Sequence, residues 1–241
     1  MATPPLAPAK DFNARGLDFY HRGDLERAEE YFLRAVAASQ AGDHLDVKAQ
    51  AVYNLALVHL DRGEVDEAVS ELRVAEGLFR RIEQPDGLSR ALAARAAIRV
   101  RKGRHGEAKR IYEKALAEAP KRVAAEILTN LAIVHLKMND LTTALQLSQQ
   151  AVEQASNDLV LSDALYNRGR ILIRAGTYES ARHALERALV LDRDMGRYRS
   201  LAETLSLLGH LAARLGNDDE SAEYHRRAKD VLEGLGLDRP D

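Results

Sequence analysis

Histidine is the residue of this chain best suited to binding a metal or transferring protons, because cysteine is absent. Eight histidines occur, and the closest pairs, His44–His59 and His210–His225, are each fifteen residues apart. No single helix can therefore present two histidines on adjacent turns, which is the arrangement of helical zinc sites. The spacing predicts neither a metal site nor a bound cofactor.

Glycine spacing gives no support for catalysis either. The sequence contains no glycine loop of a mononucleotide or dinucleotide site and no nucleophile elbow. The segment Gly103-Arg104-His105-Gly106 resembles a glycine loop only superficially, since it fits a turn between two helices. We therefore expect a protein that is not an enzyme.

Composition limits the partners. Charged residues make up 30% of the chain, yet the net charge is only −2, so the basic excess of a nucleic-acid-binding protein is missing. No apolar run approaches the roughly 18 residues of a membrane span. Residues 1–9, MATPPLAPA, carry three prolines and no apolar signal-peptide core, which predicts a flexible lead.

Turn signals recur along the sequence at intervals of 36–40 residues. Each signal is a glycine or asparagine that is followed by a segment with helical periodicity, and the six residues are Gly23, Gly63, Gly103, Asn139, Gly176 and Gly216. Three further slots, seven residues before each turn and five and twelve residues after it, hold only Gly, Ala or Ser. These slots contain Gly16, Ala28, Ala35, Ala56, Ala68, Ala75, Ala96, Ala108, Ala115, Ala132, Ala144, Ala151, Gly169, Ala181, Ala188, Gly209, Ser221 and Ala228. Such agreement indicates six copies of one unit.

Each slot has a physical role in a pair of helices. Glycine and asparagine tolerate the positive φ of a residue that ends a helix. Asp24, Asp140 and Asn217 follow their turns directly, where side chains that cap the next helix belong. Small residues allow two helices to cross closely. Since Ala, Leu, Arg and Glu dominate and no strand-like alternation occurs, the sequence predicts an all-α chain.

This pattern resembles the tetratricopeptide repeat, whose signature combines aromatic residues, glycine, alanine and a final proline. The first copy has Phe12, Gly16, Phe19, Ala28, Phe32 and Ala35, and the third ends in Pro120. The resemblance implies a right-handed α-solenoid of six helix-turn-helix repeats over residues 11–236, between a flexible lead (1–10) and tail (237–241). The usual period is 34 residues, so these repeats are of a longer type.

In this family the first helix of each repeat lines a concave groove, and the resemblance transfers that role to particular positions. The candidate groove residues are Asn13, Tyr53, Asn54, Asn130, Tyr166 and Asn167. The remaining positions of the same two slots hold Ala14, Ala93, Ala94, Thr129, Ser206 and Leu207. An asparagine amide can both donate to and accept from the backbone of an extended peptide, and tyrosine adds flat apolar area. The alternative is that these asparagines cap or brace neighbouring helices.

A basic row adjoins these positions. Arg101, Lys137 and Arg174 occupy one slot at the end of successive first helices, and Arg170 lies one turn before Arg174. The row would suit an acidic peptide or a terminal carboxylate. The alternative is that these cations only interact with the helix dipole.

The resemblance thus implies a scaffold that binds a protein or peptide. One alternative is a structural or assembly role, including self-association through Val231, Leu232 and Leu235 at the C-terminal end. Another is a ligand-sensing regulatory domain. Residues 2–9 also resemble the lead of bacterial lipoproteins involved in pilus or envelope assembly, so a soluble protein of either the cytoplasm or the periplasm fits the sequence.

Overall fold

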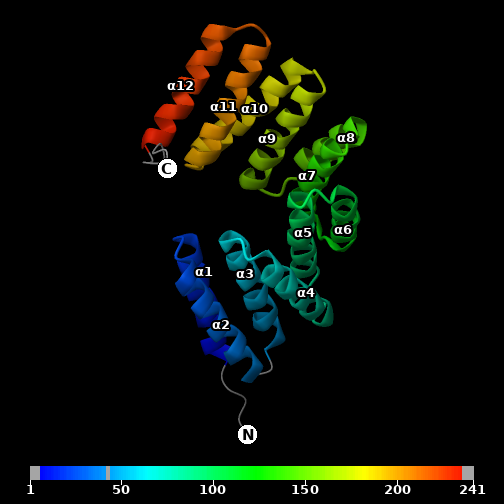
Figure 1. The fold of residues 1–241 in the computed structure, drawn as a ribbon, viewed down its shortest axis with the longest axis vertical. Helices are drawn as coiled ribbons and strands as arrows, with labels where there is room; N and C mark the ends of the chain where they lie inside the picture. Colours follow the sequence, from blue (N-terminus) through cyan, green and yellow to red (C-terminus); the bar gives the residue numbers. More distant parts are fainter. Residues whose placement is uncertain (1–5, 42–43, 235–241) are drawn as a thin grey trace. The chain divides into compact units, whose positions relative to one another are not determined.

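The computed structural model describes residues 6–41 and 44–234, and these residues form helices joined by short turns, with no strand among them (Figure 1). The helices are α1 (Leu6–His21), α2 (Leu25–Ala41), α3 (Leu45–Arg62), α4 (Val65–Arg81), α5 (Pro85–Arg101), α6 (His105–Glu118), α7 (Lys121–Lys137), α8 (Leu141–Glu153), α9 (Asp158–Arg174), α10 (Tyr178–Asp194), α11 (Tyr198–Arg214) and α12 (Asp218–Gly234). The all-α prediction and the six helix-turn-helix repeats are confirmed. Helix α1 begins at Leu6, so part of the lead predicted for residues 1–10 is helical.

The six predicted turns occur where the sequence pattern places them. Each turn residue follows an odd-numbered helix, here called an A helix, and precedes an even-numbered B helix. All six have positive φ, from 62° at Asn139 to 81° at Gly63. The side chains of Asp24 and Asp140 accept hydrogen bonds from the backbone of Arg27 and Thr143, so both aspartates cap a B helix as predicted.

All eighteen small slots are buried. A Cβ added at Gly16 would lie 2.5 Å from the Phe32 ring, and one added at Gly169 would lie 2.6 Å from Leu185. Carbon atoms of real side chains do not approach so closely. Glycine is therefore required at these positions because a large side chain of the B helix lies directly against the backbone of its A helix.

The chain divides into two compact units, residues 1–120 and residues 121–241. Each unit contains three hairpins, α1–α6 in the first and α7–α12 in the second. Within a unit, a B helix packs against the A helix of its own hairpin and against the A helix of the next hairpin. The small slots on both sides of each B helix make this double packing possible.

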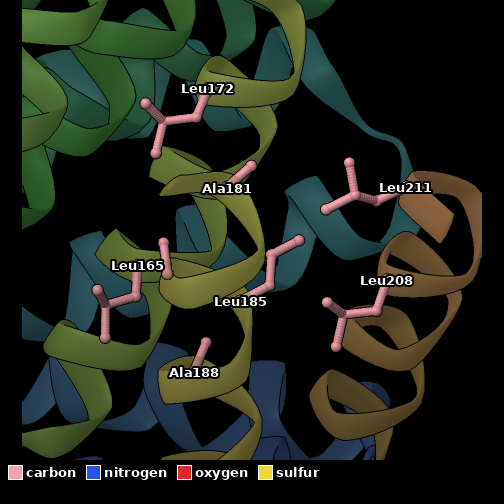
Figure 2. Close-up of a cluster of buried hydrophobic side chains, with 8 residues drawn as sticks. Leu165, Leu172, Ala181, Leu185, Ala188, Leu208 and Leu211 are labelled. Atoms are coloured by element: carbon pink, nitrogen blue, oxygen red, sulfur yellow. The ribbon is translucent and has the colours of Figure 1, made fainter. Parts of the chain in front are cut away.

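The core of the second unit illustrates this arrangement. Leu185 on α10, together with Ala181 and Ala188, lies between Leu165 and Leu172 of α9 on one side and leucines of α11 on the other (Figure 2). Because α10 presents one leucine between two alanines, α9 and α11 both approach it closely. Burial of this cluster joins the second and third hairpins of the unit.

Candidate functional site

The A helices form the inner side of each unit. Neighbouring A helices contact one another directly, α1 with α3 and α3 with α5 in the first unit, and α7 with α9 and α9 with α11 in the second. Among the described residues of each unit, no Cα atoms of successive B helices lie within 8 Å of each other. The hairpins therefore splay on the B side, and we call the inner surface of the A helices the A wall.

In the first unit, two of the predicted groove residues, Asn13 and Asn54, are hydrogen-bonded to each other. Asn54 is only 3% exposed, and its Nδ2 donates a hydrogen bond of 3.1 Å to Asn13 Oδ1. Its Oδ1 accepts a hydrogen bond of 3.0 Å from Gln50 Nε2. The donor of the Asn54 amide thus joins α3 to α1, and its acceptor is used within α3, so the amide braces the helices, which is the alternative role expected from the sequence.

A hollow of about 330 Å³ lies beside this asparagine pair, between α1 and α3. Asn13 lines the hollow, but Asn54 does not. The remaining lining residues are Lys10, Ala14, Leu17, Asp46, Val47, Gln50 and Gln84. Of the other predicted residues in this unit, Tyr53 is half-buried and Arg101 is exposed.

In the second unit, three predicted residues form one cluster on α9. The guanidinium of Arg170 lies 5.9 Å from the centre of the Tyr166 ring and donates a hydrogen bond of 3.1 Å to Asn167 Oδ1. Asn167 Nδ2 donates to the carbonyl of Asp163, 2.9 Å away on the preceding turn. Burial raises the pKa of the half-buried Tyr166 hydroxyl. The cluster holds an aromatic face and a cation together at the edge of the A wall.

Tyr166 also lines a hollow of about 490 Å³ between α9, α11 and α12. The predicted slots of the sixth copy, Ser206 and Leu207, line it too. The other lining residues were not predicted from the sequence, and they are Arg199, Ala202, Glu203, His210 and Leu232. Those on α11 lie at helical spacing before and after Ser206 and Leu207, so the amphipathic pattern could have identified them, whereas Leu232 approaches from α12.

The other predicted residues of the second unit point to solvent. Asn130, Lys137 and Arg174 are exposed on α7 and α9. Among the described residues, no ion pair involves Lys137 or Arg174. The two cations therefore contribute uncompensated positive charge to the end of the A helices.

The most concentrated group of titratable side chains lies elsewhere, in the first unit. His59 on α3 is buried, with Nδ1 at 2.8 Å from Glu71 Oε2 and Nε2 at 3.4 Å from Glu29 Oε1. Glu64 lies 3.6 Å from Nε2, and Arg62 pairs with Glu29. Burial lowers the pKa of His59, but the hydrogen bonds and charges of Glu71 and Glu29 outweigh burial, so the pKa is raised. The group joins α2, α3 and α4.

This raised pKa predicts a pH dependence of stability. The charged His59 stabilises the fold fully below the unfolded pKa of about 6.5, and this contribution is lost as pH rises through the higher folded pKa. Phenylalanine occupies the position of His59 in the first repeat, as Phe19. His59→Phe should therefore fit the fold, and it should flatten the fall in melting temperature between neutral and mildly alkaline pH. His21→Gln removes an exposed imidazole and is the control. An unchanged pH profile in the His59→Phe protein would contradict the assignment.

In the parts of the chain that the structure describes, no group of three or more His, Asp or Glu side chains could hold a metal ion. No helix over residues 6–41 or 44–234 is long and apolar enough to cross a membrane.

Comparisons with known proteins agree with the repeat pattern. A family model described as tetratricopeptide repeat matches residues 87–157, 123–194 and 160–234, and a second model of the same description matches residues 13–81. Together they account for most of the chain, and neither describes a catalytic family. A comparison with curated protein sequences gave no significant match.

Solved structures similar to this chain share its fold at low sequence identity. BtubC (BKLC) from P. vanneervenii has a TM-score of 0.73 and 20% identity, covering 90% of this chain and 94% of its own. PilF of Pseudomonas aeruginosa has a TM-score of 0.66 and 20% identity, and the match covers 96% of this chain and 95% of PilF. The apo quorum sensor NprR from B. thuringiensis has a TM-score of 0.65 and 16% identity, and the match covers 92% of this chain and 75% of NprR. Identities this low establish the fold alone.

Proposed function

Since the chain belongs to the tetratricopeptide-repeat family, we propose that it is a non-catalytic scaffold that binds a peptide or protein segment on the A wall. The second unit carries the principal site. The observation on which this proposal rests is the hollow between α9, α11 and α12. Its volume of about 490 Å³ lies within the range of ligand-binding pockets, roughly 300–1,000 Å³.

The lining of this hollow suits a peptide. Tyr166, Ala202, Leu207 and Leu232 provide apolar area for a partner side chain. Arg199, Glu203 and His210 form a polar rim that can exclude water and orient the partner. Tyrosine loses little conformational entropy on binding, so we assign Tyr166 as the anchor.

The charge of the neighbouring helix ends favours acidic partners. Arg170 lies beside Tyr166, and the exposed Lys137 and Arg174 have no ion-pair partner in the described chain. Positive charge of this kind raises the association rate with acidic segments and is screened by salt. Asn167 uses its Oδ1 and Nδ2 within α9, and its role is to hold Arg170 rather than to clamp the partner backbone.

A second candidate function is self-association at the C-terminal end. Val231 and Leu232 on α12 are half-buried against Leu201 and Leu205 of α11. Leu235, the third residue predicted for this contact, lies outside the described residues. Val231→Asp should reduce the mass measured by sedimentation at high protein concentration if this surface joins two copies. A third candidate is ligand sensing, the role named for the quorum sensor NprR.

The proposed function predicts that Tyr166 dominates peptide binding. Peptides selected from a random display library against the wild-type chain should bind Tyr166→Ala at least about thirtyfold more weakly, because a central aromatic anchor contributes about 2 kcal/mol. Tyr198→Ala is the matched control, since Tyr198 is also on the second unit but is exposed and lies outside the hollow.

Two further measurements make the result decisive. Arg170→Gln should weaken binding at low salt and change it little at high salt, because it removes an exposed cation. Circular dichroism should give the same helix content for all three variants. Selected peptides that bind Tyr166→Ala and the wild type equally would move the partner site away from this hollow.

A further inference from the structure

The second unit has another pair of hollows, which lie between α8, α9 and α10 and not on the A wall. One hollow, of about 400 Å³, is lined by Gln149, Val152, Leu165, Arg168, Leu172, Glu179, Ser180, His183, Ala184 and Arg187. The other, of about 340 Å³, is lined by Leu161, His183, Glu186, Arg187, Val190 and Leu191. Because both include His183 and Arg187, they are adjacent, and we call them together the outer groove.

The short helix α8 explains why the outer groove is open. It has thirteen residues and ends at Glu153, whereas α10 and α12 have seventeen. The first turn of α9 and the last turns of α10 therefore lack the neighbouring B-helix turn that a longer α8 would supply. Leu159 and Val190 remain 48% and 45% exposed there. An exposed apolar surface of this kind favours a partner.

Arg168 gives the first hollow a cation that forms no ion pair with any described residue. One of its nitrogens, Nη1, donates to the carbonyl of Leu145 at 3.3 Å and to the Ser148 hydroxyl at 3.2 Å. These acceptors are neutral, and burial lowers the pKa of Arg168, opposed only by the charge of Glu153. Glu153 itself accepts a hydrogen bond from Gln149. A half-buried guanidinium with donors to spare is suited to a carboxylate.

The other charged residues of the groove leave this preference in place. Arg187 and His183 are exposed on the same face of α10 as the hollow, and no ion pair between described residues involves Arg187. Glu186 lines only the second hollow, and Arg182 is paired mainly with Glu220, whose hydrogen bond is the chief cause of the raised pKa of Arg182, while the charge of Glu186 adds a smaller effect. Glu179 lines the opposite end of the first hollow. The cations thus gather where the two hollows meet.

We propose that the outer groove binds an extended peptide segment in which one acidic side chain is flanked by aliphatic side chains. The acidic group pairs with Arg168 and Arg187, and the aliphatic groups cover Leu161, Val190 and Leu191. The groove follows α10 from Glu179 to Leu191, which is about 18 Å at 1.5 Å per residue. That length matches about five residues of extended chain and exceeds a small carboxylate.

The test uses the full chain labelled with ¹⁵N and a synthetic peptide with the core Leu-Leu-Asp-Leu-Leu between glycines. Amide signals of α10 and the start of α9 should shift on titration. The matched peptide with Asn in place of Asp should bind at least about fivefold more weakly, because a charge-assisted hydrogen bond is lost. Octanoate, a small carboxylate with an aliphatic chain, should bind far more weakly than the Asp peptide.

Variants separate this groove from the A wall. Arg187→Gln should weaken binding of the Asp peptide about as much as replacing Asp by Asn in the peptide does. Because the Arg187 side chain is exposed, this variant should fold normally. Arg193→Gln removes an exposed arginine of the same helix outside the groove and should change nothing. Tyr166→Ala should also leave this binding unchanged.

Several results would overturn the proposal. They are the absence of any shift at the groove, equal affinity for the Asp and Asn peptides, equal affinity of octanoate and the peptide, and shifts confined to the hollow lined by Tyr166. Equal binding by octanoate would indicate a site for small amphipathic acids instead. The first three results leave the A-wall proposal untouched and the fourth would agree with it, so failure of the outer groove does not imply failure of the A wall.

Discussion

Leu185→Ala should lower the free energy of unfolding by about 2–5 kcal/mol, because it leaves a cavity at the centre of the second unit. Leu185 is fully buried between α9 and α11 (Figure 2), and the adjacent small slots hold alanines that cannot fill the space. The measurement is urea unfolding followed by circular dichroism. A loss below about 1 kcal/mol would mean that α9 and α11 close around the cavity.

Leu185 also allows a test of the close crossing in its own hairpin. A Cβ at Gly169 would lie 2.6 Å from Leu185 Cγ, so Gly169→Ala alone should destabilise the protein by about 1–3 kcal/mol. In the Leu185→Ala background the obstructing atoms are gone. The double variant should therefore be more stable than the sum of the single losses predicts, and the difference measures the coupling.

Gly77→Ala is the matched control for this cycle. Gly77 lies within α4 with nothing within 4 Å of the position of an added Cβ. Alanine favours a helix over glycine by about 0.5–1 kcal/mol, so this change should stabilise the protein. Strictly additive losses at Gly169 and Leu185 would contradict the close helix crossing.

The turns and crossings could be predicted from the sequence because they depend on local rules. Positive φ selects glycine or asparagine at each turn, and close crossing selects a small residue at fixed offsets from it. Both constraints act within one hairpin, and the same offsets recur in every copy. A repeated pattern of this kind therefore predicts the helices and their pairing without any knowledge of distant contacts.

The contacts between hairpins could not be predicted in the same way. Asn54 and Asn167 occupy one slot of the repeat, yet Asn54 is buried against Asn13 of another helix, whereas Asn167 bonds within its own. The difference depends on the residue that each faces on the neighbouring A helix, and that residue varies between copies. The hollow beside Tyr166 likewise needs Leu232, which approaches from α12.

Ion pairs between hairpins were also missed, because charged residues in a helical sequence are normally assigned to solvent. Glu76 on α4 and Arg95 on α5 form such a pair, with Arg95 Nε at 2.7 Å from Glu76 Oε1 and Nη2 at 3.1 Å from Oε2. Their side chains are only 10% and 19% exposed. The Nη2 hydrogen bond and the close ion contact at Nε together join the second hairpin to the third.

Glu76→Ala should consequently destabilise the protein by about 3 kcal/mol, because it leaves the Arg95 guanidinium desolvated without its partner. Replacing both residues by apolar side chains of similar length, Glu76→Leu with Arg95→Met, should restore most of this loss. The gain arises because no unpaired charge then remains between α4 and α5. Urea unfolding gives the free energies, and amide hydrogen exchange in α4 and α5 locates the change.

The exposed pair Lys109–Glu113 on α6 provides the control, since its loss should cost no more than about 0.5 kcal/mol. If Glu76→Ala were as mild as this control, Arg95 would have to reach water by a change of rotamer. If the apolar double variant were as unstable as Glu76→Ala, the geometry of the pair itself, rather than the penalty of an unpaired charge, would hold the second and third hairpins together.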